Sequence, residues 1–190
     1  MKKTIAFIFL IHFYLCTFSQ SESYFKNNGM FILDFGLSGN EYLNLNIDIV
    51  SKRFLYGFQY DFIRNSKIIG EDYTSTINWN QFPEDFVSSG KEITQIITFN
   101  FGYNIFEKFI LGCGLGFGED INYKNMYDNY HILGNNGYYH LIKEGEIKPQ
   151  IKVFAKYFIP ITKKFHISLS SQLTSLTGFG GSAGIGILLQ

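Results

Sequence analysis

The chain has 190 residues, and its 16 basic and 16 acidic residues give a formal net charge of zero. This length corresponds to one domain, and the balanced charge gives no electrostatic case for nucleic-acid binding, which needs a clustered basic face. The 21 Phe, 13 Tyr and 19 Gly against only 3 Pro favour strands and turns over helices.

The beginning of the chain is typical of a secretory signal peptide. Two lysines precede an apolar run from residue 5 to residue 15, and small residues lie three and one positions before an expected cut after Ser19. We therefore expect residues 1–19 to be removed on export and residues 20–190 to form one mature domain. A lipoprotein acylated at Cys16 is the second interpretation of this segment.

Eight segments of the mature chain alternate apolar and polar residues. Alternation of period two predicts β-strands, because successive side chains of a strand point to opposite faces. The sequence therefore predicts an all-β fold, an eight-stranded antiparallel up-and-down barrel. The segments span residues 31–38, 43–49, 54–62, 93–103, 109–118, 148–157, 165–173 and 183–190.

The links between these segments differ in length. Tight turns on one side and longer loops on the other are the asymmetry expected of an outer-membrane barrel. The sequence thus predicts short turns in the periplasm and two long loops outside. The short links are 51–53, 104–108 and 160–164, the long polar ones are 65–92 and 119–146, and 39–41 and 174–182 lie on the long side.

Two barrel architectures fit the alternation, and they differ in the face that points inward. A soluble lipocalin-like barrel is apolar inside, whereas a membrane barrel is apolar outside with a polar lumen. The polar face carries acids and lysines that can pair, and the glycines of residues 112–118 lie on that face, where they would make room for long side chains of the next strand. We therefore expect a membrane barrel with a polar network in the lumen, formed by Asp34, Asp48, Asp61, Lys152, Lys156 and His166.

Two pairs of polar side chains are candidate sites of chemistry. His166 and Ser168 share one face of a strand, a spacing compatible with a lipid-modifying enzyme, but His166 falls near the periplasmic end. His131 and His140 share a long loop with acidic residues, but their spacing matches no metal-ligand pattern. We therefore predict no catalytic residue, no cofactor and no metal ion.

Aromatic residues in the first long loop form a third candidate. Trp79 and Phe82 lie among polar neighbours. They could contact an extracellular ligand or partner, or they could fold back onto the barrel or the opposite loop. Both alternatives stay open from the sequence.

With these features the chain resembles the small eight-stranded outer-membrane barrels of Gram-negative bacteria, the class that includes the membrane domain of outer membrane protein A. The Phe18-Ser19-Gln20 ending resembles cleavage sites of exported Bacteroidetes proteins. The resemblance covers nearly the whole mature chain and rests on pattern, and the chain departs from the class by ending on Gln190 and not on an aromatic residue. It implies an outer-membrane location, with outer-membrane lipid and the barrel-assembly machinery as partners.

These observations predict a monomeric, non-enzymatic barrel that displays its long loops for adhesion, envelope integrity or partner binding. Two alternatives from other functional classes remain. One is an enzyme of the outer membrane that modifies lipid A or phospholipids. The other is a soluble periplasmic carrier of an apolar ligand.

Overall fold

The computed structural model describes residues 29–39, 41–73, 77–106, 108–134 and 136–189. The predicted signal peptide and Cys16 lie outside the described residues. No helix in the described ranges is long and apolar enough to cross a membrane.

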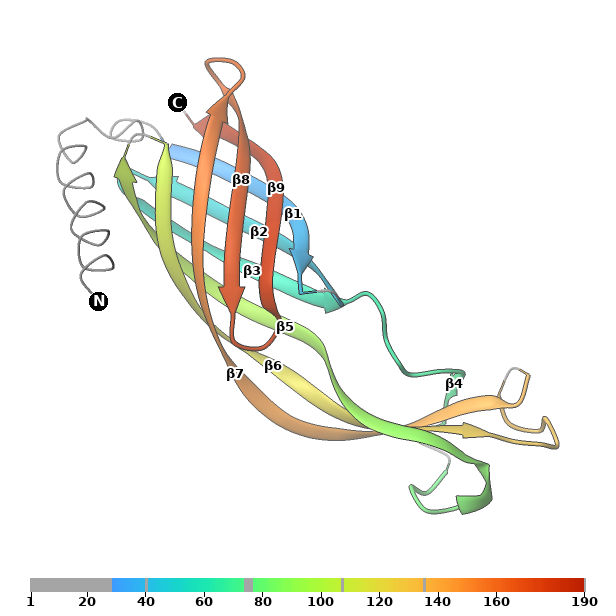
Figure 1. Cartoon of the computed structure of the whole chain (residues 1–190). Coiled ribbons are helices and arrows are strands. Elements are labelled where there is room, and N and C mark those ends of the chain that lie inside the picture. The colour runs from blue at the N-terminus through green and yellow to red at the C-terminus, as the bar shows by residue number, and fades with distance from the viewer. Residues whose placement is uncertain (1–28, 40, 74–76, 107, 135, 190) are drawn as a thin grey trace, which may run out of the picture.

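Eight strands form a closed antiparallel barrel (Figure 1). Each strand pairs with its neighbour along the chain, and the last strand closes the sheet against the first, with Gly29 opposite Leu189. The predicted eight-stranded up-and-down barrel is confirmed. Its strands are β1 (Gly29–Ser38), β2 (Tyr42–Ser51), β3 (Phe54–Ile63), β5 (Phe86–Phe106), β6 (Phe109–Tyr127), β7 (Tyr138–Pro160), β8 (Phe165–Thr174) and β9 (Gly178–Leu189).

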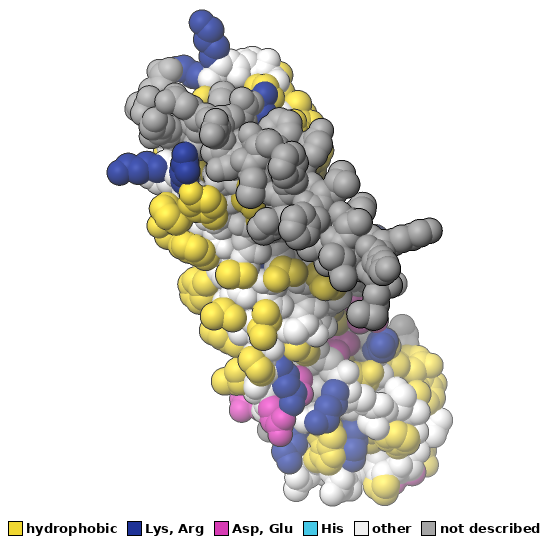
Figure 2. Space-filling model, turned by 60° about the vertical axis from the view of Figure 1, so that its left-hand side comes forward, with side chains coloured by type: hydrophobic (Ala, Val, Ile, Leu, Met, Phe, Trp, Pro, Cys, Tyr) yellow, Lys and Arg dark blue, Asp and Glu magenta, His cyan; other side chains and the backbone are white. Residues whose placement is uncertain are grey.

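The barrel wall is apolar on the outside and polar on the inside. Phe58 is 40% exposed, whereas the adjacent Gln59 is fully buried, and Leu115 is 67% exposed. Figure 2 shows hydrophobic side chains gathered over the barrel wall, with charged side chains above and below them. A lipocalin-like carrier has the opposite arrangement, with an apolar interior and a polar outer face, so the described part of the barrel does not match it.

An apolar cluster fills one part of the lumen. The ring of Phe154 points inward and belongs to a cluster whose other buried members come from β1, β2, β3, β6 and β7 itself. Inward apolar residues such as Ile32 and Phe154 interrupt the polar side of the alternation, so the lumen holds an apolar plug beside its polar network. The cluster consists of Met30, Ile32, Val50, Leu55, Ile110, Phe154 and Phe158.

Three strands continue beyond the barrel and form an arm (Figure 1). β3 ends its pairing with β5 at Gln95, and β8 pairs with β7 only as far as Lys152. The pairs between β5, β6 and β7 nevertheless continue, to Phe86 opposite Met126 on one side and to Tyr127 opposite Tyr138 on the other. The arm is thus a three-stranded sheet made of the outer parts of β5, β6 and β7.

The prediction of two long loops is therefore wrong in part, because much of residues 86–92 and 119–146 is strand. Register shifts next to Thr94 and Asp120 mark β-bulges at the base of the arm. A bulge adds one residue to a strand and changes which face the following side chains occupy. Alternation with Ile97 predicts Ile93 on the outer face. The structure instead places it inside, where its Cγ2 would be 2.9 Å from a Cβ placed on Gly118.

Two short elements complete the arm. β4 (Glu71–Asp72) adds a short parallel pairing to β7, and the 3-10 helix η1 (Pro83–Asp85) leads into β5. Both belong to the connection between β3 and β5. This connection therefore lies against the arm over part of its length.

Candidate functional site: the lumen network and the arm groove

Lys156 occupies the centre of the polar network in the lumen. Its Nζ lies 2.6 Å from Oδ2 of Asp34 and 2.5 Å from Oδ2 of Asp48. All three side chains are almost completely buried. One ammonium group thus links strands β7, β1 and β2 across the interior, and pairing offsets the cost of removing these charges from water.

Lys152 forms the second part of the network, two inward positions before Lys156 on β7, with the inward ring of Phe154 between them. Its Nζ donates to Oε1 of Gln59 at 2.5 Å and to Oδ1 of Asn46 at 3.3 Å. The amide of Gln59 in turn donates to Asp61 at 2.7 Å, and the hydroxyl of Ser38 donates to the same carboxylate at 2.9 Å. Gln59 therefore links the Lys152 ammonium to the Asp61 carboxylate by two successive hydrogen bonds.

The structure brings together five of the six predicted lumen residues and adds several amides that were not in the predicted network. Gln172 on β8 donates to the Ser38 hydroxyl at 2.6 Å, and Asn100 donates to Asp48 at 3.1 Å. Both amides occupy the alternate positions of their strands that face the lumen. This alternation is the sequence feature that could have identified them. Lys148 has the same four-residue spacing from Lys152 as Lys156 has, but it does not join the lumen network. It lies at the base of the arm, where it pairs with Asp120 at 3.7 Å and with Glu146.

Glycines make room for the buried carboxylates and for one ring. A Cβ on Gly57 would overlap Oδ1 of Asp48, and one on Gly184 would overlap Oδ1 of Asp34. A Cβ on Gly112 would overlap the ring of Phe154, whereas one on Gly116 would overlap backbone of β5. The prediction that the glycines make room for the neighbouring strand thus holds at Gly112 but not at Gly116.

His166, the sixth predicted lumen residue, lies on β8 at the short-turn end. It pairs with Pro160 of β7 and Gly186 of β9 and is fully buried, as is Ser168. A pair enclosed in this way has no access to a lipid substrate outside the barrel. The structure therefore gives no support to a lipid-modifying site at these residues.

The connection between β3 and β5 is held on the arm by polar contacts. The amide N–H of Ile69 donates to Asn125 at 3.0 Å, and that of Tyr73 donates to the carbonyl of His140 at 3.1 Å. The Lys124 ammonium donates to the carbonyl of Trp79 at 2.9 Å and lies 4.7 Å from the centroid of its ring. These contacts fix the connection along much of its length.

An apolar cluster on the arm lies beneath the same connection. Trp79 and Phe82, the predicted loop-contact residues, pack against it, so in this structure both fold back onto the arm. The Tyr73 and Tyr139 rings meet edge to face at 5.7 Å. Buried Met126, Tyr139 and Leu141 form the cluster, and Tyr73, Ile77, Trp79, Phe82 and Leu133 cover it.

A groove of about 680 Å³ opens beside this cluster, between the connection and the turn from β6 to β7. Tyr130 and Ile132 form part of its wall, and they are 86% and 79% exposed. Aromatic and aliphatic side chains with a few polar groups are typical of a binding pocket of this size. The lining residues are Tyr73, Ile77, Gln81, Phe82, Glu84, Asp85, Asp128, Asn129, Tyr130, Ile132 and Leu133.

Two carboxylates of the groove have structural partners. Asp85 accepts a hydrogen bond of 2.9 Å from the hydroxyl of Tyr139, and burial together with this carboxylate raises the pKa of Tyr139. Asp128 accepts the backbone N–H groups of Tyr130, Ile132 and Leu133, which lower its pKa. Both carboxylates therefore shape the walls of the groove.

The two loop histidines lie apart from each other. Nδ1 of His140 is 3.1 Å from the carbonyl oxygens of both Ile69 and Gly70. Nε2 of His131 is 3.0 Å from the hydroxyl of Tyr127. Among the residues that the structure describes, no three His, Cys, Asp or Glu side chains gather as a metal site would require.

Comparison with known proteins gives similarity at the level of overall shape. No protein-family model and no curated protein matches the chain. Neisserial surface protein A is 7% identical with a TM-score of 0.40, over 84% of this chain and 94% of that one.

Two further solved structures are similar to the chain. The N-terminal β-barrel domain of Pseudomonas aeruginosa OprF is 12% identical with a TM-score of 0.36, over 86% of this chain and 98% of that one. A designed transmembrane β-barrel is 10% identical with a TM-score of 0.36, over 85% and 95%.

Proposed function

We propose that the chain is a non-enzymatic outer-membrane β-barrel that holds the three-stranded arm outside the bilayer and binds a partner through the groove on that arm. The observation that carries the membrane location is the apolar outer wall around a polar interior. Water would not stabilise a wall that exposes Phe35, Phe99 and Leu115 by 61%, 62% and 67%, whereas lipid would.

The dimensions of the wall support this location. β2 has ten residues, and ten residues at about 3.3 Å rise, tilted by about 40°, span about 25 Å. That span equals the height of the apolar band of outer-membrane barrels. Outer-membrane lipid is therefore the proposed surrounding of the wall, and the barrel needs no second copy to close its sheet.

The packed interior supports an anchoring role in preference to transport. Lys152 and Lys156 are each 2% exposed and bonded across the lumen, and the Phe154 cluster fills the space beside them. The interior of an eight-stranded barrel is just wide enough for side chains to fill it. We therefore infer that the barrel anchors the arm and does not conduct solutes.

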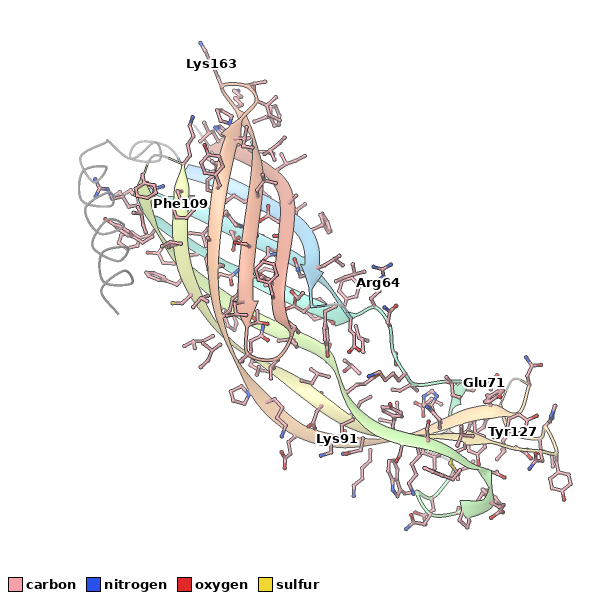
Figure 3. All side chains as sticks on the ribbon, in the orientation of Figure 1. Arg64, Glu71, Lys91, Phe109, Tyr127 and Lys163 are labelled. Atoms are coloured by element: carbon pink, nitrogen blue, oxygen red, sulfur yellow. The ribbon has the colours of Figure 1, made fainter. Side chains whose placement is uncertain are left out.

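The arm supports a role in partner binding. Its groove lies far from the barrel, at the end where Figure 3 labels Glu71 and Tyr127. Exposed apolar side chains around a groove are typical of interaction sites. Adhesion and recognition of another envelope component both fit this arrangement.

Labelling of Cys113 tests the membrane location. In the described part of the chain Cys113 is the free cysteine, and it is exposed on the outer wall between Phe101 and Val153. In a Cys16→Ser background reconstituted in phospholipid vesicles, we expect a lipid-soluble maleimide to label Cys113 and a charged, water-soluble maleimide to leave it unlabelled. A cysteine placed at Ser88 on the arm is the matched control and should react with both reagents.

Rapid labelling of Cys113 by the water-soluble reagent in folded protein would contradict the membrane location. Recovery of the native protein in a soluble periplasmic fraction would contradict it independently. Partner binding by the arm is tested by replacing residues 77–85, which line part of the groove, with a Gly-Ser linker. We expect this variant to fold as a barrel but to lose binding to cells or envelope components.

A further inference from the structure

The short-turn end of the barrel carries a rim of basic side chains. Figure 3 shows Lys163 at this end, pointing away from the barrel and opposite to the arm. The rim comes from three turns that are far apart in the sequence, between β2 and β3, β5 and β6, and β7 and β8. Its described basic residues are Lys52, Arg53, Lys108, Lys163 and Lys164.

The rim positions carry an unbalanced charge. In the described part of the chain the ion pairs lie in the lumen or on the arm side, such as Lys67 with Glu41, and none involves a rim residue. Glu107 is the one acidic residue in the sequence of these turns, and it lies outside the described residues. The arm side has the opposite bias, because acidic residues outnumber basic ones there.

An aromatic layer separates the rim from the apolar wall. The rings of Phe54 and Tyr103 are 5.4 Å apart, and those of Phe106 and Phe109 stack at 5.5 Å. Outer-membrane barrels carry girdles of aromatic residues at both bilayer interfaces. Arg53 donates to the hydroxyl of Tyr103 at 3.2 Å, so the basic groups lie directly next to this aromatic layer.

The order from the wall outward is thus apolar, aromatic and basic, which matches the order from hydrocarbon through interface to headgroup phosphate. We propose that this rim binds the phosphate groups of anionic phospholipids in the leaflet around the short turns. The proposal rests on the membrane location proposed above. Each Lys or Arg near an anionic leaflet strengthens attachment by about 1 kcal/mol, or about fivefold.

Native mass spectrometry of the folded full chain tests the rim. The protein is released from vesicles of phosphatidylcholine mixed with phosphatidylglycerol, and the lipids that stay bound are counted. We expect preferential retention of phosphatidylglycerol by the parent chain. The double variant Lys163→Gln/Lys164→Gln should lose this preference by roughly tenfold or more, and added salt should weaken it because salt screens exposed charges.

The matched control is Lys91→Gln/Lys143→Gln, which removes two exposed lysines from the arm and should leave the preference unchanged. Heat-modifiable gel migration of each sample shows whether the barrel is folded. A folded rim variant that retains phosphatidylglycerol like the parent would overturn the proposal, as would an equal loss in the arm variant. A parent chain that does not insert into vesicles overturns the membrane location as well, so the two failures are distinguishable.

Discussion

The ammonium group of Lys156 on β7 lies 2.6 Å from Oδ2 of Asp34 on β1, although 122 residues separate the two in the sequence. The same Nζ contacts Asp48 on β2. Since β1 and β7 are separated in the sheet by β9 and β8, the lysine crosses the lumen to reach its partners. The ion pairs therefore depend on closure of the barrel.

Replacing Lys156 by Met should destabilise the barrel by about 3–5 kcal/mol, because Asp34 and Asp48 would remain buried without their cation. Urea-induced unfolding in vesicles measures this free energy. The triple variant Lys156→Met/Asp34→Asn/Asp48→Asn should recover most of the loss, and Lys143→Met on the arm is the exposed control. A loss below about 1 kcal/mol for Lys156→Met would show that the pairs contribute little.

Gly57→Ala should destabilise the barrel by about 1–3 kcal/mol, since the added methyl group overlaps the Asp48 carboxylate and the β2 backbone. Gly29→Ala is the matched control, because the nearest atom to its Cβ would be 3.5 Å away. The same unfolding assay compares the two. Equal stability of the two variants would contradict the proposed need for space at Gly57.

The turn between β6 and β7 should open at low pH. Three backbone N–H groups favour the charged form of Asp128 and hold its pKa below the ordinary value of 3.8. A group with a lowered pKa in the folded state stabilises the fold above its unfolded pKa, and this contribution disappears as the pH falls through the folded pKa. The stabilisation should therefore be complete at neutral pH and be lost below about pH 4.

Hydrogen exchange of residues 129–134 across this pH range measures the opening of the turn. Asp128→Ala should give fast exchange already at pH 7, because the same N–H groups lose their acceptor. Exchange in β2 is the internal control and should not follow the variant. Protection of the turn that stays constant from pH 7 to pH 2 would disprove the role of the carboxylate.

Lys124→Met should loosen the connection between β3 and β5 from the arm. The variant loses a hydrogen bond to the Trp79 carbonyl and the cation–π contact with its ring, an interaction of about 0.5–1 kcal/mol at exposed sites. Trp79 is the single tryptophan of the chain, so its emission reports the change. We expect a red shift and faster proteolysis near residue 79, and Lys143→Met should show neither.

The sequence was a reliable guide to the strands of the barrel because alternation is a local property. Phe58 and Gln59 already differ in polarity as neighbours, and the structure places them on opposite faces. The alternation failed at Ile93, where the bulge next to Thr94 moves the side chain to the other face. A bulge depends on pairing with the next strand and leaves little trace in one segment.

The arm and its groove could not be predicted from local pattern. Residues 119–127 read as a polar loop, but pairing with β5 and β7 makes them strand. The groove brings Tyr73 together with Leu133, residues from two different connections. The sequence leaves open whether Trp79 contacts a partner or folds back, and its contact with Lys124 joins residues 45 positions apart, which no local pattern predicts.

By itself the sequence determined the number of barrel strands and, at most positions, the face of each residue, because a period of two is fixed by the geometry of the extended chain. The tertiary structure decided which lysine meets which carboxylate, where the glycines must leave space, and that three strands continue as an arm. These features depend on contacts between residues far apart in the chain. Such contacts are set when the sheet closes and not by any single segment.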